Sequence, residues 1–124
     1  MKLMMSAVLV MWGWGLAAGC DNPSSDFDYV YCATQLFVQA DKDLNTAYQE
    51  LRGKLNPAGV ALLRTGQLAW IRERNTSCTR RDDSGRTTNL DCAVAMTQAR
   101  TAFLKARIRE CNSTGCVNSR LREP

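Results

Sequence analysis

The sequence of 124 residues contains no histidine. This absence removes the commonest general base and the commonest metal ligand, and with them every Ser/His or Cys/His catalytic pair. The close acidic pairs, Asp41/Asp43 and Asp82/Asp83, do not converge on one substrate, because successive or alternate residues point in different directions. A glycine-rich phosphate loop and a Cys-x-x-Cys pair are also absent from the sequence. We therefore expect neither an enzyme, nor a cofactor, nor a metal site.

Charge of both signs is present, but it is unevenly placed along the chain. Residues 21–50 hold six acids and one base, whereas residues 51–124 hold fourteen bases and six acids. From Cys20 onward, 15 basic and 12 acidic residues give a net charge of about +3. A cationic body of this kind can approach anionic lipid headgroups or an acidic partner. The arginines are not interleaved with aromatic residues, so we do not expect nucleic acid as a partner.

The first nineteen residues have the features of a secretory signal peptide. A short basic start at Lys2 is followed by an apolar run over residues 3–16 and by the small residues 17–19. The run is shorter than the roughly 20 apolar residues that a membrane-spanning helix needs. We predict that residues 1–19 direct export to the cell envelope and are then removed.

The string LAAGC, which ends at Cys20, is similar to a bacterial lipobox. It predicts lipidation of Cys20, a lipid-proximal tether over residues 20–27, and anchoring at the periplasmic face of the membrane. Ala17 departs from this motif, since a lipobox usually has leucine there. The alternative is ordinary cleavage near Gly19, which leaves Cys20 free to form a disulfide in a soluble periplasmic protein. Asp21 resembles a signal that keeps lipoproteins on the inner membrane, but the sequence leaves the choice of membrane open.

Apolar residues recur at spacings of three and four over residues 28–55, from Asn56-Pro57 to about residue 79, and over residues 91–111. These three helices predict an all-α fold, a three-helix up-down-up antiparallel bundle with disulfide staples. The domain would span residues 28–111, and residues 112–124 would form a C-terminal tail. The stretch TRRDDSGRTTNLD, residues 79–91, has no apolar period and predicts a loop over the surface.

Six cysteines indicate covalent cross-links, which widen the thin stability margin of a domain of about 100 residues in an oxidising compartment. The predicted topology brings Cys78 and Cys92 to one end of the bundle. A bridge between them would close a loop of about fifteen residues and stabilise the fold by about 3 kcal/mol. Cys111 and Cys116 lie at the other end, where they would pin the tail. Cys32 is left unassigned, or it pairs with Cys20 or Cys92.

Several polar residues share helix faces with core residues. They are Asp41, Asn45, Tyr48, Gln67, Trp70, Arg74, Thr97 and Arg100. We favour a buried polar network in which Asp41 and Asn45 pair with Gln67, Arg74 or Arg100 across the helix interfaces, because inward-facing polar groups must be hydrogen-bonded. The alternative is that these residues form a binding surface.

At these residues the chain resembles the lysozyme inhibitor LprI-like family, a group of small exported bacterial domains. The family pattern is a cysteine, then Asp-x-x-Leu-Asn-x-x-Tyr, then Leu-x-x-x-Gln-x-x-Trp-Ile-x-x-Arg and a cysteine, then a cysteine and Thr-x-x-Arg-x-x-x-Leu. The matching positions are Cys32, Asp41, Leu44, Asn45, Tyr48, Leu63, Gln67, Trp70, Ile71, Arg74, Cys78, Cys92, Thr97, Arg100 and Leu104. Asn75 departs from the pattern, since members often carry an acid there. Members also often have a further cysteine about twelve residues before the first, and Cys20 sits at that spacing.

The resemblance implies inhibition of lysozyme, so the expected partner is a protein, a lysozyme in the first instance. The loop over residues 79–91 is the candidate contact segment. Its candidate residues are Arg80, Arg81, Asp82, Asp83 and Arg86. Common lysozymes are strongly basic, so a cationic body would be repelled at long range unless the acidic first helix makes the contact. The alternative function is a periplasmic protein-protein interaction module, such as an assembly subunit or a toxin-immunity protein, without lysozyme inhibition.

Overall fold

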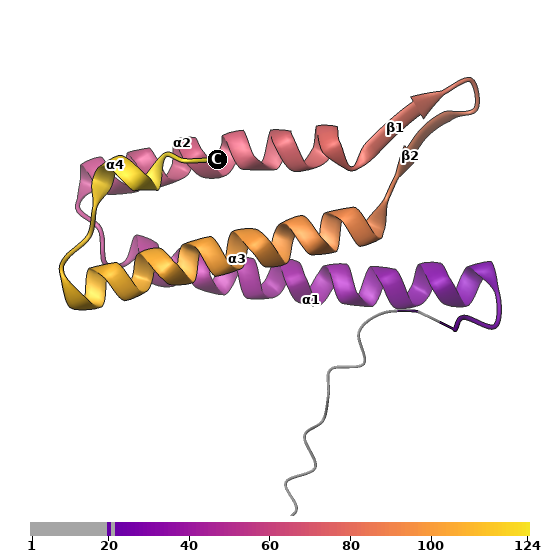
Figure 1. Ribbon diagram of the computed structural model, residues 1–124, viewed down its shortest axis with the longest axis horizontal. Helices are drawn as coiled ribbons and strands as arrows, with labels where there is room; N and C mark the ends of the chain where they lie inside the picture. The colour runs from indigo at the N-terminus through magenta and orange to yellow at the C-terminus, as the bar shows by residue number, and fades with distance from the viewer. Residues whose placement is uncertain (1–19, 21) are drawn as a thin grey trace, which may run out of the picture.

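A computed structural model describes residue 20 and residues 22–124 (Figure 1). The predicted signal peptide, residues 1–19, and Asp21 lie outside the described residues. The chain is mostly helical, as predicted, and it contains one small sheet. In order, the elements are α1 (Asp26–Arg52), α2 (Pro57–Ser77), β1 (Thr79–Asp82), β2 (Gly85–Thr88), α3 (Leu90–Ser113) and α4 (Asn118–Leu121). Among the described helices, none has the length and apolar character needed to cross a membrane.

Each long helix begins at a polar residue that caps its first turn. The backbone N–H of Asp28 donates to Ser25 Oγ (3.2 Å), that of Gly59 to Asn56 Oδ1 (2.8 Å), and that of Cys92 to Asn89 Oδ1 (3.0 Å). Asn56 is followed by Pro57 at the first helical position, which confirms the predicted start of the second helix. These caps satisfy backbone donors that have no partner within the helix.

The closest packing in the fold joins α1 to α3, which run in the same direction (Figure 1). The two starts are joined by a hydrogen bond from the Tyr29 hydroxyl to Asp91 (2.8 Å), which raises the pKa of Tyr29. On the buried side of α1, alanines recur every seven residues, at Ala33, Ala40 and Ala47. Small side chains let two helix backbones approach closely. The predicted up-down-up order already makes the first and third helices parallel, but it did not indicate that these two helices would pack most closely.

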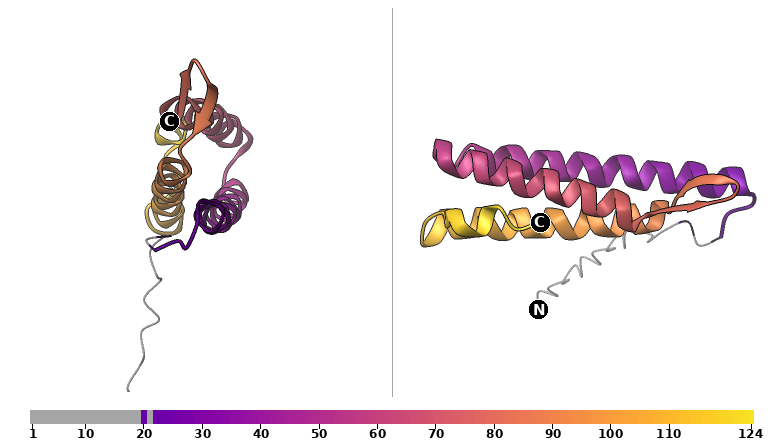
Figure 2. Two further views of the ribbon diagram at one scale, coloured as in Figure 1. Left: turned by 90° about the vertical axis from the view of Figure 1, so that its right-hand side faces the viewer. Right: turned by 90° about the horizontal axis from the view of Figure 1, so that it is seen from above.

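The apolar core lies between the three long helices, which Figure 2 shows nearly end-on in its left view. Its members are Leu44, Ala47, Leu51, Leu63, Trp70, Leu104, Ile108 and Leu121. Leu121 belongs to α4, so the segment 112–124, predicted as a plain tail, folds back onto α2. Gly66 makes this possible, because a Cβ there would lie 2.7 Å from the carbonyl oxygen of Leu121.

Three disulfides cross-link the described residues: Cys20–Cys32, Cys78–Cys92 and Cys111–Cys116. The first corrects the prediction that Cys20 carries a lipid. Its sulfur is bonded to Cys32, and one sulfur cannot hold both a thioether-linked lipid and a disulfide. The bond agrees instead with the alternative in which cleavage leaves Cys20 for a bridge. Helix α1 begins at Asp26, inside the segment 20–27 that the sequence analysis assigned to a tether.

Candidate protein-binding site

The predicted surface loop over residues 79–91 is a β-hairpin, which is a correction to the sequence analysis. β1 and β2 pair antiparallel from Thr79↔Thr88 to Asp82↔Gly85. Asp82 Oδ1 accepts a hydrogen bond from the backbone N–H of Ser84 (2.9 Å) and a second from its hydroxyl, and these bonds lower the pKa of Asp82. Gly85 has a φ of +120°, a value that side chains rarely adopt. The turn chemistry of Asp82, Ser84 and Gly85 thus closes a hairpin that has no apolar alternation.

The base of the hairpin is fixed to the helices. The Cys78–Cys92 disulfide joins the end of α2 to the first turn of α3. The backbone N–H of Asn89 donates to the carbonyl of Cys78 (2.7 Å), just outside the strand pairs. Figure 1 shows the hairpin extending from the last turn of α2 and the first turn of α3, on the side of the molecule where α1 begins. The charged hairpin is therefore held at its base by a disulfide and a backbone hydrogen bond.

Two arginines stand directly opposite each other on this hairpin. Arg81 pairs with Arg86 in the strand register, so both side chains lie on the same face of the two-stranded sheet. Both residues are exposed. Like charges in directly opposed positions destabilise a strand pair. An anion placed between them would remove this repulsion.

The same face of the hairpin borders a hollow of about 310 Å³ toward α1 and α2. Its lining includes Arg86, Arg74 and the ring of Phe37, and none of the described lining residues is acidic. The guanidinium of Arg74 lies over the Phe37 ring (5.6 Å to the centroid) and over the Trp70 ring (5.1 Å). A cationic, aromatic-walled hollow of this kind suits a carboxylate better than a cation.

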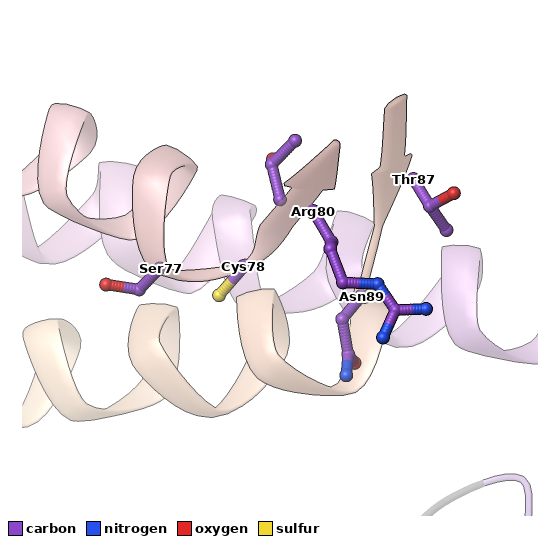
Figure 3. A pocket seen from close by; sticks show the side chains of 6 residues that line it. Ser77, Cys78, Arg80, Thr87 and Asn89 are labelled. Carbon is purple, nitrogen blue, oxygen red and sulfur yellow. The ribbon is translucent and has the colours of Figure 1, made fainter. Parts of the chain in front are cut away.

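Arg80 occupies the opposite face of the hairpin. It lines a second hollow of about 300 Å³ together with Thr87, Ser77 and Asn89. Figure 3 shows the side chains of Arg80, Thr87 and Asn89 gathered at the base of the hairpin. Asp82 and Asp83 stand at the exposed tip. The structure thus distributes the five predicted contact residues over two faces and a tip.

Four of the residues predicted as a polar network do meet. Arg100 Nε donates to Gln67 Oε1 (2.9 Å) in the buried interior, and its guanidinium lies over the Trp70 ring (5.9 Å). Arg74 stacks on the same ring. Burial lowers the pKa of Arg100 to about 10, although the carboxylates of Glu123 and Glu73 act in the opposite direction. Arg100 therefore stays charged at neutral pH inside the domain.

Three further members of the predicted network lie elsewhere. Asn45 is exposed, and within the described part of the chain its amide donates only to Asp41, four residues earlier on the same helix (3.3 Å). Tyr48 is half-buried and packs against the apolar core. The predicted pairing of Asp41 and Asn45 with Gln67 or the arginines is thus wrong, because they lie on the outer side of α1. The remaining member, Thr97, is fully buried, and its hydroxyl has no hydrogen-bond partner among the residues that the structure describes.

Arginine and aromatic side chains alternate in one stack around Arg100 and Trp70, and the sequence analysis did not predict several of its members. Phe103 packs against two guanidinium groups. Its ring centroid lies 4.4 Å from the guanidinium carbon of Arg100 and 5.0 Å from that of Arg107. The carbonyl of Glu123 accepts a hydrogen bond from Arg100 Nη1 (2.7 Å). Arg107 lies seven residues after Arg100 on one face of α3, a spacing that could have revealed the stack. The contact from Glu123 had no local signal, since it depends on the return of the chain through α4.

Among the described residues, no group of three Cys, Asp or Glu side chains is placed to hold a metal ion. What the hairpin end can do chemically is to donate hydrogen bonds, because arginine offers several N–H groups in a planar fork and no acceptor. The arrangement therefore fits recognition of carboxylates on a protein surface.

A family model described as Lysozyme inhibitor LprI matches residues 20–104, which is more than half of the chain. No curated protein and no solved structure matches the chain. The family match takes in Cys20, α1, α2, the hairpin with its disulfide, and α3 as far as Leu104. The chain belongs to the LprI family of lysozyme inhibitors.

Proposed function

We propose that this protein is exported to the cell envelope and inhibits a muramidase by placing the arginines of its hairpin in the acidic substrate cleft. The observation that carries the proposal is the opposed pair Arg81 and Arg86 on a braced, exposed hairpin of a family member. The protein would act by binding alone. A non-catalytic role is consistent with a family of inhibitors.

The chemistry of the target supports arginine as the contact residue. Glycoside hydrolases of this class commonly use a pair of carboxyl groups on either side of the scissile bond. A guanidinium can make two parallel hydrogen bonds to one carboxylate, and such charge-assisted bonds are short and strong. Two guanidiniums held side by side could therefore engage the two carboxyl groups and exclude the sugar.

The support of the hairpin favours tight binding. A segment that is already ordered loses less conformational entropy when it binds, so more of the contact free energy appears as affinity. The Cys78–Cys92 disulfide and the Asn89 to Cys78 hydrogen bond order the hairpin before contact. The hydrogen bonds from Ser84 hold Asp82 in the turn and keep it charged, one residue beyond the opposed arginines.

Export is part of the proposal. The leader over residues 1–19 predicts secretion, and three disulfides suit an oxidising compartment rather than the cytoplasm. We place the mature protein in the periplasm, where a muramidase acts on the cell wall.

The test is a lysozyme turbidity assay with the purified disulfide-bonded domain. We expect inhibition by the wild-type domain and at least a tenfold loss of potency in the double variant Arg81→Ala/Arg86→Ala. The matched control is Arg64→Ala/Arg72→Ala, which removes the same charge from exposed positions on α2 and should retain potency. Absence of inhibition at a large molar excess of wild type would remove the proposal. Binding without inhibition would favour the interaction-module alternative.

A further inference from the structure

A second surface of the molecule has no role in the hairpin contact. Six large apolar side chains are exposed among the described residues, and four of them lie in the first half of α1. They are Phe27 (77% exposed), Val30 (53%), Tyr31 (60%) and Val38 (55%). With Thr34 they recur at spacings of three and four residues, so they form one continuous strip, here called the α1 stripe.

The α1 stripe is not part of the fold's own packing. The buried side of the helix is formed by Ala33, Ala40 and the leucines that follow, on a different side of the same cylinder. The rings of Phe27 and Tyr31 are stacked on each other, with centroids 6.5 Å apart. A stacked aromatic pair held on a rigid helix is an ordered apolar surface that water covers in the free protein. Contiguous exposed apolar surface of this kind marks interaction sites.

The charge along the part of α1 that carries the stripe is mainly negative. Between residues 22 and 41 there are three acids, Asp26, Asp28 and Asp41, and no lysine or arginine. The stripe continues past Val38 into a shallow hollow lined by Asp41 and Asn45, where Lys42 is the one basic lining residue among those that the structure describes. Residues 52–124, by contrast, hold fourteen bases and six acids. The α1 stripe is thus an acidic, aromatic surface on an otherwise cationic body.

We propose that the α1 stripe is a docking surface for a basic protein, and specifically for the cationic surface of the muramidase whose cleft the hairpin enters. This inference rests on the proposed function and deepens it. Basic residues of the partner would meet Asp26, Asp28 and Asp41, while its apolar side chains would pack on Phe27 and Tyr31.

Electrostatics explains why a second surface is needed. A hairpin of arginines on a cationic body is repelled by a basic enzyme until it reaches the acidic cleft. An acidic patch at the same end of the molecule would orient the encounter and raise the association rate. Figure 1 and the right view of Figure 2 both place the hairpin and the start of α1 at that end. The α1 stripe would guide and hold the partner, and the hairpin would block its cleft.

The experiment compares three variants in binding to a basic c-type lysozyme, with inhibition measured in parallel. Tyr31→Ala/Val38→Ala removes apolar surface from the α1 stripe, and Asp28→Asn/Asp41→Asn removes its charge. Leu68→Ala is the matched control, because Leu68 is an exposed apolar residue on α2 (44% exposed). All the substituted side chains are wholly or partly exposed, and thermal unfolding by circular dichroism verifies that each variant is folded.

We expect Tyr31→Ala/Val38→Ala to weaken binding at least tenfold, while Leu68→Ala changes it less than twofold. Asp28→Asn/Asp41→Asn should slow association severalfold in low salt and make its rate less dependent on salt. If wild type inhibits and both stripe variants bind as tightly as Leu68→Ala, the inference is wrong and the proposed function stands. If wild type neither binds nor inhibits, the proposed function fails, and the inference fails with it. A dimer of the free protein that Tyr31→Ala abolishes, with lysozyme binding unchanged, would assign the stripe to a second copy and also overturn the inference.

Discussion

Replacing Arg100 by methionine tests the buried arginine on which the packing of α2, α3 and the C-terminal segment converges. The side chain of Arg100 donates to Gln67 Oε1 and to the carbonyl of Glu123, and it stacks on Trp70 and Phe103. Methionine fills a similar part of the space but donates no hydrogen bond. The oxygen of Gln67 is then left buried without a partner.

The magnitude follows from these contacts. A hydrogen bond to a charged group contributes about 1.5–3 kcal/mol, and stacking of a guanidinium on an aromatic ring contributes about 0.5–2 kcal/mol. Removing a buried charge returns part of this loss, since Arg100 is desolvated in the fold. We expect Arg100→Met to lower the free energy of unfolding by about 2–4 kcal/mol. Gln67→Met should cost about 2 kcal/mol, because it leaves Arg100 Nε without its acceptor.

Urea unfolding followed by circular dichroism measures both effects and their coupling. The double variant Arg100→Met/Gln67→Met removes donor and acceptor together, so we expect it to be more stable than the sum of the single changes by about 2 kcal/mol. Strictly additive costs, or an Arg100→Met domain as stable as wild type, would refute the assignment of this hydrogen bond as a buried, stabilising contact.

Three further predictions concern cross-links and packing. Cys78→Ser/Cys92→Ser should destabilise the domain by about 3 kcal/mol in thermal or urea unfolding and weaken inhibition, because the base of the hairpin is released; unchanged potency would show that the brace is dispensable. Gly66→Ala should detach α4 and increase hydrogen exchange in residues 118–124, whereas unchanged protection would show that the tail tolerates a side chain there. Mass spectrometry of the exported protein should find a peptide linking Cys20 to Cys32 and no diacylglycerol, and a lipid on Cys20 would contradict this disulfide.

The long helices could be predicted from sequence because each has local signals. Apolar spacing marks their buried sides, and Asn56-Pro57 marks a helix start. The pairing of α1 with α3 was not predictable in the same way. It depends on small residues from two segments far apart in the chain, such as Ala40 in α1, and helix periodicity does not say which helix an alanine meets.

The position of the candidate site in the chain could be predicted from sequence, but its hairpin structure could not. The run from residue 79 to residue 91 was singled out by its charge, yet its strands lack the apolar alternation by which a hairpin is usually predicted. Its form depends on turn hydrogen bonds at Asp82 and on the cross-linked base. Asp41 and Asn45 were expected in the interior because they share one helix face. Helix α1 has candidate core residues on two of its faces. Only its packing against the other helices determines which of the two faces is buried.

The most direct test of the central claim, that the hairpin occupies the muramidase cleft, is competition with a bound oligosaccharide. The dissociation constant of the complex would be measured at increasing concentrations of a chitooligosaccharide that fills the cleft. Occupancy of the cleft by the hairpin predicts an apparent dissociation constant that rises linearly with the concentration of free oligosaccharide and reaches no plateau. A dissociation constant that does not change when the cleft is saturated would contradict it.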